Sequence, residues 1–223
     1  MISMEELFSA VDAYFIDKLI EKEAIFDQVL ANNQKHGLPP HDVSPSQGKF
    51  LYLLSKIAKA QRILEIGTLG GYSTIWFAKA IPQNGKIISL EFDQTHAKVA
   101  QENTKLAGFS DKIDIIVGPA SESLAQLVNE NSLPFDLIFI DADKENNPLY
   151  LKYAQQLAKS GTIIIGDNVV RNGEVLSTES NDGRILGVRQ FVDELATNQK
   201  LTSTAIETVG VKGYDGFTIS IVE

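Results

Sequence analysis

The stretch of sequence that decides the fold runs from residue 135 to residue 144 and reads FDLIFIDADK. Its first six residues are strongly apolar, which is typical of a strand that is buried on both faces of a parallel sheet. Asp141, Asp143 and Lys144 follow this run directly. The stretch therefore predicts a central strand that ends in a cluster of charged side chains.

A second apolar run, Thr162–Ile165, is followed closely by Asp167 and Asn168. If the two strands are neighbours, they lie about 5 Å apart and bring Asp141, Asp167 and Asn168 together at one edge of the sheet. Three oxygen ligands of this kind suit Mg²⁺, or another divalent cation such as Mn²⁺ or Ca²⁺, better than structural zinc. The alternative is that Asp141 and Asp143 cap a helix and that Asp167 and Asn168 form a turn. The joint placement of both motifs after buried strands favours the metal site.

Strands and helices alternate from Arg62 onward. We expect strands at Arg62–Ile66, Lys86–Leu90, Ile113–Val117, Phe135–Ile140, Thr162–Ile165, Thr202–Val209 and Gly216–Val222. Helices are expected at about Gly71–Ala80, Asp93–Ala107, Ser121–Asn131, Pro148–Ala158 and Gly187–Asn198. This alternation predicts an α/β fold with a mostly parallel sheet, right-handed crossovers and helices on both faces. The short, turn-rich segment 210–215 predicts a hairpin and an antiparallel last strand.

The first sixty residues are expected to be helical and to belong to the same single domain, residues 1–223. Residues 5–35 carry recurring apolar positions with only a weak break near residues 18–23. A further helix is expected to begin at Ser44, which can cap it, with Pro45 in the first helical position. Gln47 completes the pattern of a capping box.

Composition limits the classes of function. The chain has 223 residues, 43% hydrophobic residues, no cysteine and a formal net charge of −9. The acidic balance argues against broad nucleic-acid binding, and the lack of cysteine excludes disulfides and thiolate metal sites. There is no signal-peptide pattern and no apolar run near the roughly 18 residues that a membrane-spanning helix needs. We therefore expect a soluble, cytoplasmic protein without a membrane partner.

A glycine-containing turn follows the first expected strand. Residues 65–73 read EIGTLGGYS, and the glycines allow a sharp turn and a close approach of the backbone to a ligand. The next helix offers free N–H groups to an anion. The Gly-x-x-Gly-Gly spacing differs from that of a pyrophosphate-binding turn, so a carboxylate ligand is as plausible as a phosphate. Glu91 ends the second strand, where it can accept hydrogen bonds from the ribose hydroxyls of a nucleoside cofactor.

Together these motifs resemble the cation-dependent O-methyltransferase family, which includes the catechol and caffeoyl-CoA O-methyltransferases, and in particular its bacterial branch. The resemblance extends from Val43 to the C-terminus. The matching segments are residues 43–48 (VSPSQG), 65–68 (EIGT), 71–73 (GYS), Glu91, 141–144 (DADK) and 167–169 (DNV).

The resemblance implies the class I S-adenosylmethionine-dependent methyltransferase fold, which is Rossmann-like, with seven strands, extra N-terminal helices and S-adenosylmethionine as cofactor. It also assigns residues to the cofactor. Glu65, Gly67, Thr68 and Ser73 would hold the methionine and ribose side, and Val43 would cover the methionine tail. Glu91 would bind the ribose hydroxyls, and Ala120 and Asp143 would flank the adenosine.

The same resemblance implies a reaction. A divalent ion held by Asp141, Asp167 and Asn168 would orient two adjacent hydroxyls of a small phenolic acceptor of the catechol, caffeoyl or flavonoid type. Lys144 would then accept the hydroxyl proton. The catalytic residues are thus expected to be Lys144 and Asp141, and a homodimer is expected.

The acceptor is expected to lie under residues 169–187, a polar segment that we interpret as a lid and specificity loop. Arg171 and Asn172 are its candidate substrate contacts. Arg171 stands where the plant enzymes often have an aromatic residue, and Asn147 stands where they often have a tyrosine. Both differences argue against a plant-type acceptor, including a CoA thioester.

Three other functions stay open at this point. The acceptor could be a hydroxyl of a modified tRNA nucleoside, with Arg171, Arg184 and Arg189 as a local basic patch. The chain could also be a nicotinamide-dependent oxidoreductase, although the glycine spacing and the terminal hairpin argue against it. A binding module without activity is the third alternative, and the complete set of candidate metal ligands with Lys144 argues against that.

Overall fold

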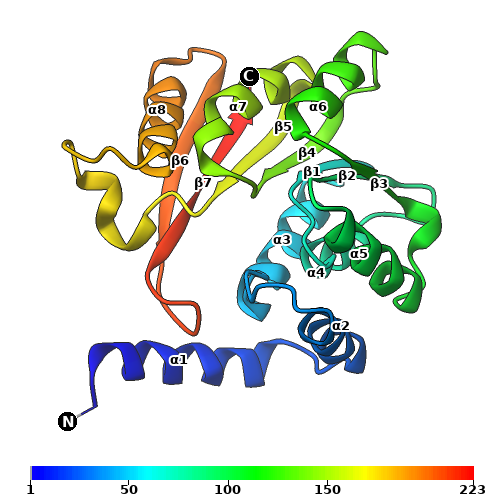
Figure 1. The fold of residues 1–223 in the computed structure, drawn as a ribbon, viewed down its shortest axis with the longest axis vertical. Coiled ribbons are helices and arrows are strands. Elements are labelled where there is room, and N and C mark those ends of the chain that lie inside the picture. Colours follow the sequence, from blue (N-terminus) through cyan, green and yellow to red (C-terminus); the bar gives the residue numbers. More distant parts are fainter. Residues whose placement is uncertain (1) are drawn as a thin grey trace.

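A seven-stranded sheet lies at the centre of the molecule, and the computed structural model describes residues 2–223 (Figure 1). The strands are β1 (Arg62–Ile66), β2 (Lys86–Glu91), β3 (Ile113–Val117), β4 (Phe135–Ile140), β5 (Ala158–Asp167), β6 (Leu201–Thr208) and β7 (Asp215–Val222). The helices are α1 (Met4–Leu19), α2 (Ala24–Lys35), α3 (Pro45–Ile57), α4 (Tyr72–Ala80), α5 (Gln94–Leu106), α6 (Ala120–Asn129), α7 (Asn147–Gln156) and α8 (Gly183–Thr197). Short 3₁₀ turns lie at η1 (Ser110–Lys112), η2 (Lys144–Asn146) and η3 (Arg171–Leu176).

The sheet has the predicted topology. Its strand order is β3-β2-β1-β4-β5-β7-β6, and the first five strands in this order are parallel. β7 runs antiparallel to both of its neighbours, β5 and β6. The prediction of a mostly parallel sheet with an antiparallel last strand is confirmed.

Two hydrophobic cores hold the helices against the two faces of the sheet. Because successive residues of a strand point to opposite faces, β4 divides its side chains between them. Ile138 and Ile140 pack with residues of α6, α7 and α8, whereas Leu137 and Phe139 pack with residues of α2, α3 and α4. These four side chains are fully buried, and each contributes about 1.5–3 kcal/mol to folding. Figure 1 shows the two groups of helices on opposite sides of the sheet.

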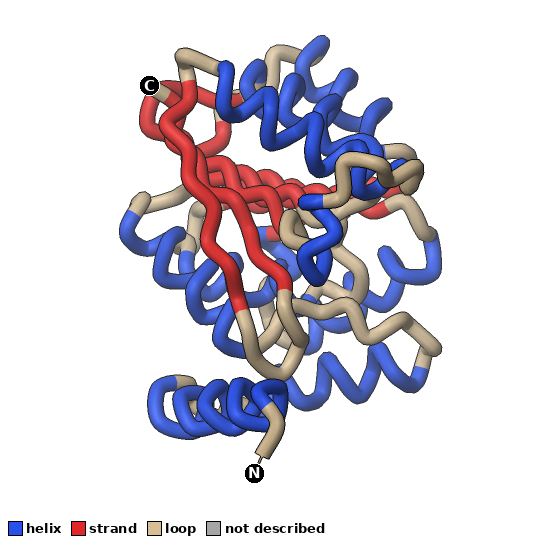
Figure 2. The backbone as a smooth tube through the Cα atoms, turned by 90° about the vertical axis from the view of Figure 1, so that its left-hand side faces the viewer, coloured by secondary structure: helices blue, strands red, loops and turns tan. Residues whose placement is uncertain are grey.

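The N-terminal helices differ in one respect from the prediction. The weak break expected within residues 5–35 is a complete one, because Ile20 is extended and α2 begins only at Ala24. No residue of α1 is buried. Asp12 connects this helix to the remainder of the chain, since its carboxylate accepts hydrogen bonds from the Ser46 hydroxyl (2.7 Å) and from the Val211 N–H (3.2 Å). Figure 2 shows the loop of the β6–β7 hairpin reaching toward α1.

Other predicted boundaries need correction. β5 begins four residues earlier than expected and continues to Asp167, so this aspartate is the last residue of the strand. α8 begins at Gly183, where Asp182 caps it by accepting a hydrogen bond from the Arg184 N–H, so the segment expected to be a loop to residue 187 ends at residue 182. Of the two hydrogen bonds of the capping box predicted at α3, only the one accepted by Ser44 is present. Ser44 accepts a hydrogen bond from the Gln47 N–H, but the Gln47 side chain points elsewhere.

Within residues 2–223, no helix is both long and apolar enough to cross a membrane.

Gly67 makes the sharp exit from β1 possible, and this gives a first prediction. Its φ is +95°, and a Cβ atom there would lie 2.1 Å from the carbonyl oxygen of Asp141. Gly108 is a matched control, since its φ is +78° but a Cβ atom there would meet no other atom within 4 Å. We expect Gly67→Ala to lower the free energy of unfolding by about 1–3 kcal/mol more than Gly108→Ala, as measured by urea denaturation. An equal loss of unfolding free energy in both variants would contradict the close approach of residue 67 to the Asp141 carbonyl oxygen.

Candidate functional site

The carboxyl ends of β4 and β5 lie side by side at one edge of the sheet. Their parallel register pairs Ile140 with Gly166. Asp141 directly follows the first of these residues and Asp167 the second. The two aspartates that the sequence predicted to meet therefore leave the sheet at the same level, and Asn168 follows next.

Asp167 is buried, the Asp141 side chain is 21% exposed, and Lys144 and Gln47 contact the pair. The Lys144 ammonium lies 2.9 Å from Asp141 Oδ1, and the Lys144 side chain is only 7% exposed. Asp167 accepts hydrogen bonds from Gln47 Nε2 (2.7 Å) and from the Asn168 N–H (2.9 Å). Burial, reinforced by the negative charge of Asp141, raises the pKa of Asp167 to about 7. Asp141 and Asp167 repel each other, so a nearby positive charge stabilises the pair of carboxylates.

The backbone is strained where the chain leaves this pair. Asn168, Arg171 and Asn172 have φ values of 56°, 55° and 54°, in the left-handed region that is uncommon for an arginine and more accessible to asparagine. Asp215 holds the segment in place, because its Oδ1 atom accepts hydrogen bonds from the N–H groups of Val170 and Arg171, both at 3.0 Å. Backbone strain of this kind gathers at functional sites.

Gln47 and Asp215 are site residues that the sequence analysis missed as such. Gln47 had a local explanation as a helix cap, and Asp215 had one as a turn residue. Their contacts join residues 120 and 45 positions apart in the chain, so no local pattern indicates them.

The glycine turn lies next to this pair, at the end of β1. Gly67, Leu69 and Gly71 all have positive φ values, of 95°, 49° and 84°. Glu91 at the end of β2 supports the turn, since its Oε2 atom accepts hydrogen bonds from the N–H groups of Thr68 (3.1 Å) and Leu69 (2.8 Å). The structure thus brings together the turn and the acidic side chain that the sequence assigned to one cofactor.

Glu65 lies beneath the turn, where none of it is exposed. Its carboxylate accepts hydrogen bonds from the hydroxyls of Ser73 (2.6 Å), Ser89 (2.6 Å) and Thr74. Burial raises the pKa of Glu65, while these three hydroxyls act in the opposite direction. Glu65 and Ser73 therefore interact with each other beneath the turn, and the Thr68 hydroxyl, which is also buried, lies 2.8 Å from that of Thr74.

The remaining candidates for the cofactor surround this edge. Val43 is buried in the core on the α2–α4 face. Ala120 is the first residue of α6, which begins just after β3. Asp143 is exposed, and its Oδ1 atom accepts a hydrogen bond from the Tyr150 hydroxyl.

The candidate substrate contacts and basic residues lie in and after η3. Arg171 is partly buried, and its Nε atom has no hydrogen-bond partner. Arg184 forms an ion pair with Asp182, and Arg189 donates to the Val175 carbonyl oxygen at 2.7 Å. These internal contacts do not favour a basic patch free for nucleic acid. Asn147 is fully buried at the start of α7, and neither its Nδ2 nor its Oδ1 atom has a partner.

The donor set fits a hard divalent cation. Among residues 2–223 there is no group of three or more His, Cys, Asp or Glu side chains arranged to hold a metal. The candidate set instead has two carboxylates and one amide, whose oxygen atoms suit Mg²⁺, Mn²⁺ or Ca²⁺. Such a site beside a turn suited to an anionic or nucleoside ligand can bring two reactants together.

Comparison with known proteins identifies the family. A family model described as O-methyltransferase matches residues 17–220. A catechol O-methyltransferase from Niastella koreensis is 44% identical over 218 residues, which are 98% of this chain and 99% of that protein. A catechol O-methyltransferase from Mycobacterium tuberculosis is 43% identical and covers 95% of this chain and 94% of its own length. The crystal structure of an O-methyltransferase from Bacillus cereus in complex with SAH superimposes with a TM-score of 0.97 at 50% identity, over 99% of this chain and all of that one. The chain therefore belongs to the O-methyltransferase family of enzymes.

Proposed function

We propose that this enzyme uses S-adenosylmethionine and a divalent cation to methylate one hydroxyl of a small phenolic that carries two adjacent hydroxyls. The observation that carries the proposal is the carboxylate pair of Asp141 and Asp167 at the ends of neighbouring strands, with Lys144 held against it.

Three residues would hold the cation: Asp141, Asp167 and Asn168. The raised pKa of Asp167 supports this assignment, because the repulsion from Asp141 that contributes to it is relieved when a cation is bound. Mg²⁺ is the ion we expect, since it combines one or two carboxylates with ligands from the substrate. When bound, the cation lowers the pKa of a coordinated hydroxyl.

The glycine turn and Glu91 would hold the cofactor. The Bacillus cereus relative contains SAH, the demethylated form of S-adenosylmethionine, and it shares the fold over almost the whole chain. In this chain Gly67 brings the backbone close to the site, and Glu91 offers an acceptor at the end of the next strand. We assign Thr68, Ser73 and Val43 to the methionine side, with Glu65 acting through its hydrogen bond to Ser73, and Ala120 and Asp143 to the adenosine.

In the reaction, the bond between the sulfonium sulfur and its methyl carbon breaks as the bond between that carbon and the acceptor oxygen forms. The hydroxyl proton passes to Lys144 Nζ, and the products are a methyl ether and S-adenosylhomocysteine. To accept the proton, Lys144 must be a neutral amine. A cation bound by Asp141 would take over the carboxylate that pairs with the Lys144 ammonium in this structure, and would so favour the neutral form. Holding the two reactants in line also lowers the activation free energy, by about 7–11 kcal/mol at most.

The acceptor would bind between the carboxylate pair and the segment 169–182. Arg171 and Asn172 lie in the strained part of this segment and are the proposed acceptor contacts. The unpaired Nε atom of Arg171 offers a hydrogen-bond donor to a polar acceptor. Two relatives of similar length are named catechol O-methyltransferases, which supports a catechol-type acceptor.

The proposal predicts metal-dependent methyl transfer. With labelled S-adenosylmethionine and caffeic acid, we expect turnover with Mg²⁺, none after EDTA treatment and recovery when Mg²⁺ is restored. Lys144→Ala should lower kcat by about a hundredfold or more, the usual contribution of a general base. Lys152→Ala, at an exposed position of α7, is the matched control and should keep wild-type activity.

Two results would overturn parts of this proposal. Turnover that survives removal of the metal would contradict the role of the carboxylate pair. Cofactor binding without methylation of any catechol would contradict the acceptor, and methylation of tRNA would then be the next assay.

We also propose that the enzyme is a homodimer that buries α1. α1 has no buried residue, and most of its large apolar side chains are exposed. Tyr14, Phe15 and Leu19 are 59%, 50% and 70% exposed, and Leu53 and Ile57 of α3 are also exposed. A second copy of the chain would cover this surface, since both copies present the same apolar residues.

The oligomeric state tests this second proposal. Size-exclusion chromatography with light scattering should give a mass twice the 24.5 kDa of the chain. Phe15→Glu should convert the protein to a monomer, whereas Leu133→Glu, at a 67% exposed site before β4, should leave the dimer intact. A wild-type protein that is monomeric at micromolar concentration would contradict the proposed dimer.

A further inference from the structure

A fully buried amide on α5 also contacts the glycine turn. Asn103 lies on α5 and has no exposed surface. Its Nδ2 atom donates to the carbonyl oxygen of Gly70 (2.8 Å) and to Asn33 Oδ1 (2.9 Å), and its Oδ1 atom accepts from Asn32 Nδ2 (2.8 Å). Both N–H groups and the oxygen of this amide therefore have partners.

Asn33 connects Asn103 to the segment at residues 42–43, which is a second part of the proposed cofactor site. It lies on α2 with 3% of its surface exposed, and its Nδ2 atom donates to Asp42 Oδ1 at 3.0 Å. Asp42 directly precedes Val43, the residue assigned to the methionine tail. Asn33 also packs tightly on the turn, because a Cβ atom at Gly70 would lie 2.0 Å from its Oδ1 atom.

The hydrogen bonds therefore connect Gly70, Asn103, Asn33 and Asp42 in series. We propose that Asn103 and Asn33 are positioning residues, which fix the glycine turn and the segment at residue 43 in the geometry that binds S-adenosylmethionine. The turn needs such support, because Leu69 holds a positive φ of 49°. The two hydrogen bonds that Asn103 Nδ2 donates hold its amide against the turn and against Asn33, and a site that is already ordered binds its ligand more tightly.

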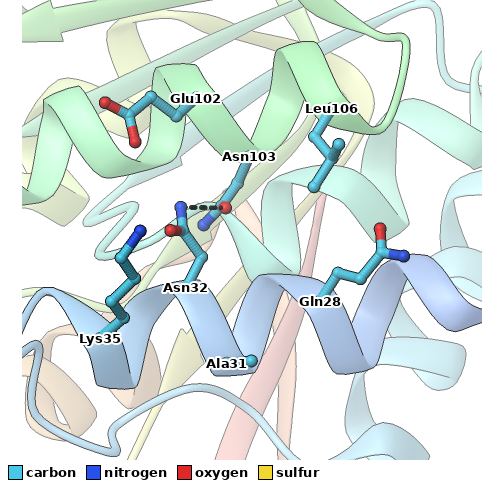
Figure 3. A pocket seen from close by; sticks show the side chains of 7 residues that line it. All are labelled: Gln28, Ala31, Asn32, Lys35, Glu102, Asn103 and Leu106. Carbon is cyan, nitrogen blue, oxygen red and sulfur yellow. Dashed lines mark hydrogen bonds between the residues drawn. The ribbon is translucent and has the colours of Figure 1, made fainter.

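Asn32 provides the matched control for this network. It lines a groove of about 450 Å³ between α2 and α5, beside Lys35 and Glu102 (Figure 3). Figure 3 shows its hydrogen bond to Asn103 at the wall of that groove. Water in the groove can replace this bond after Asn32→Ala, and the bonds to Gly70 and Asp42 remain.

The inference rests on the proposed cofactor, so the experiment measures the binding of S-adenosylhomocysteine by isothermal titration calorimetry. We expect Asn103→Ala and Asn33→Ala each to raise Kd about tenfold, which corresponds to about 1.4 kcal/mol, and Asn32→Ala to leave it within about twofold. In activity assays KM for S-adenosylmethionine should rise, while KM for the acceptor should stay near the wild-type value. Leu195→Ala, in the core on the opposite face of the sheet, controls for lost stability.

The outcomes are distinct. A folded Asn103→Ala protein with the wild-type Kd for S-adenosylhomocysteine would overturn the inference. A rise in Kd for Leu195→Ala as large as that for Asn103→Ala would overturn it too. If Asn103→Ala does not fold, the Kd values of Asn33→Ala and Asn32→Ala are compared instead. Equal Kd values for these two variants would overturn the inference. A wild-type protein that does not bind S-adenosylhomocysteine would instead overturn the proposed function, and the inference with it.

Discussion

The parallel register of β4 and β5 is the constraint on which the site depends. It pairs Ile140 with Gly166, so Asp141 and Asp167 leave the sheet together. Gly166 itself leaves no room for a side chain, because a Cβ atom there would lie 2.6 Å from the ring of Phe191. The carboxylate pair is thus fixed by the packing of α8 on the sheet as well as by backbone hydrogen bonds. A rigid sheet with variable loops at its carboxyl edge is a common way to place a reactive site.

Buried polar groups then shape the glycine turn, which is the proposed cofactor site. Glu65 lies below the glycine turn with three hydroxyls around it, Glu91 holds two of its N–H groups, and Asn103 holds the Gly70 carbonyl oxygen. Each of these contacts gives a hydrogen-bond partner to a polar group of the turn or its surroundings. Leaving such a group buried without a partner costs about 1–3 kcal/mol of folding free energy. The turn keeps its strained backbone because the three side chains approach it from different elements. The hydrogen bonds that stabilise the fold are therefore also the ones that set the geometry of the proposed cofactor site.

Much of this arrangement could be predicted from the sequence, because it follows from local patterns. The apolar runs indicated the strands, and the side chains that follow them indicated the carboxylate pair, the glycine turn and Glu91. The contacts of Gln47, Asp215 and Asn103 could not be predicted, since they join residues 120, 45 and 33 positions apart in the chain. The complete break between α1 and α2 was underestimated because neither glycine nor proline marks residues 20–23. The early start of α8 was missed because its cap, Asp182, lies in a polar segment that reads as a loop.

The proposed reaction depends on the binding of a divalent cation by Asp141 and Asp167 together. The most direct test is Mn²⁺ binding followed by electron paramagnetic resonance, in the presence of S-adenosylhomocysteine, for the wild type and for Asp167→Asn. The asparagine keeps the size of the side chain and removes its charge, so folding and metal affinity can be separated when the unfolding of both proteins is measured alongside. We expect one bound ion per wild-type chain and much weaker binding in the folded variant. Equal binding by both proteins, or no binding by the wild type, would contradict it.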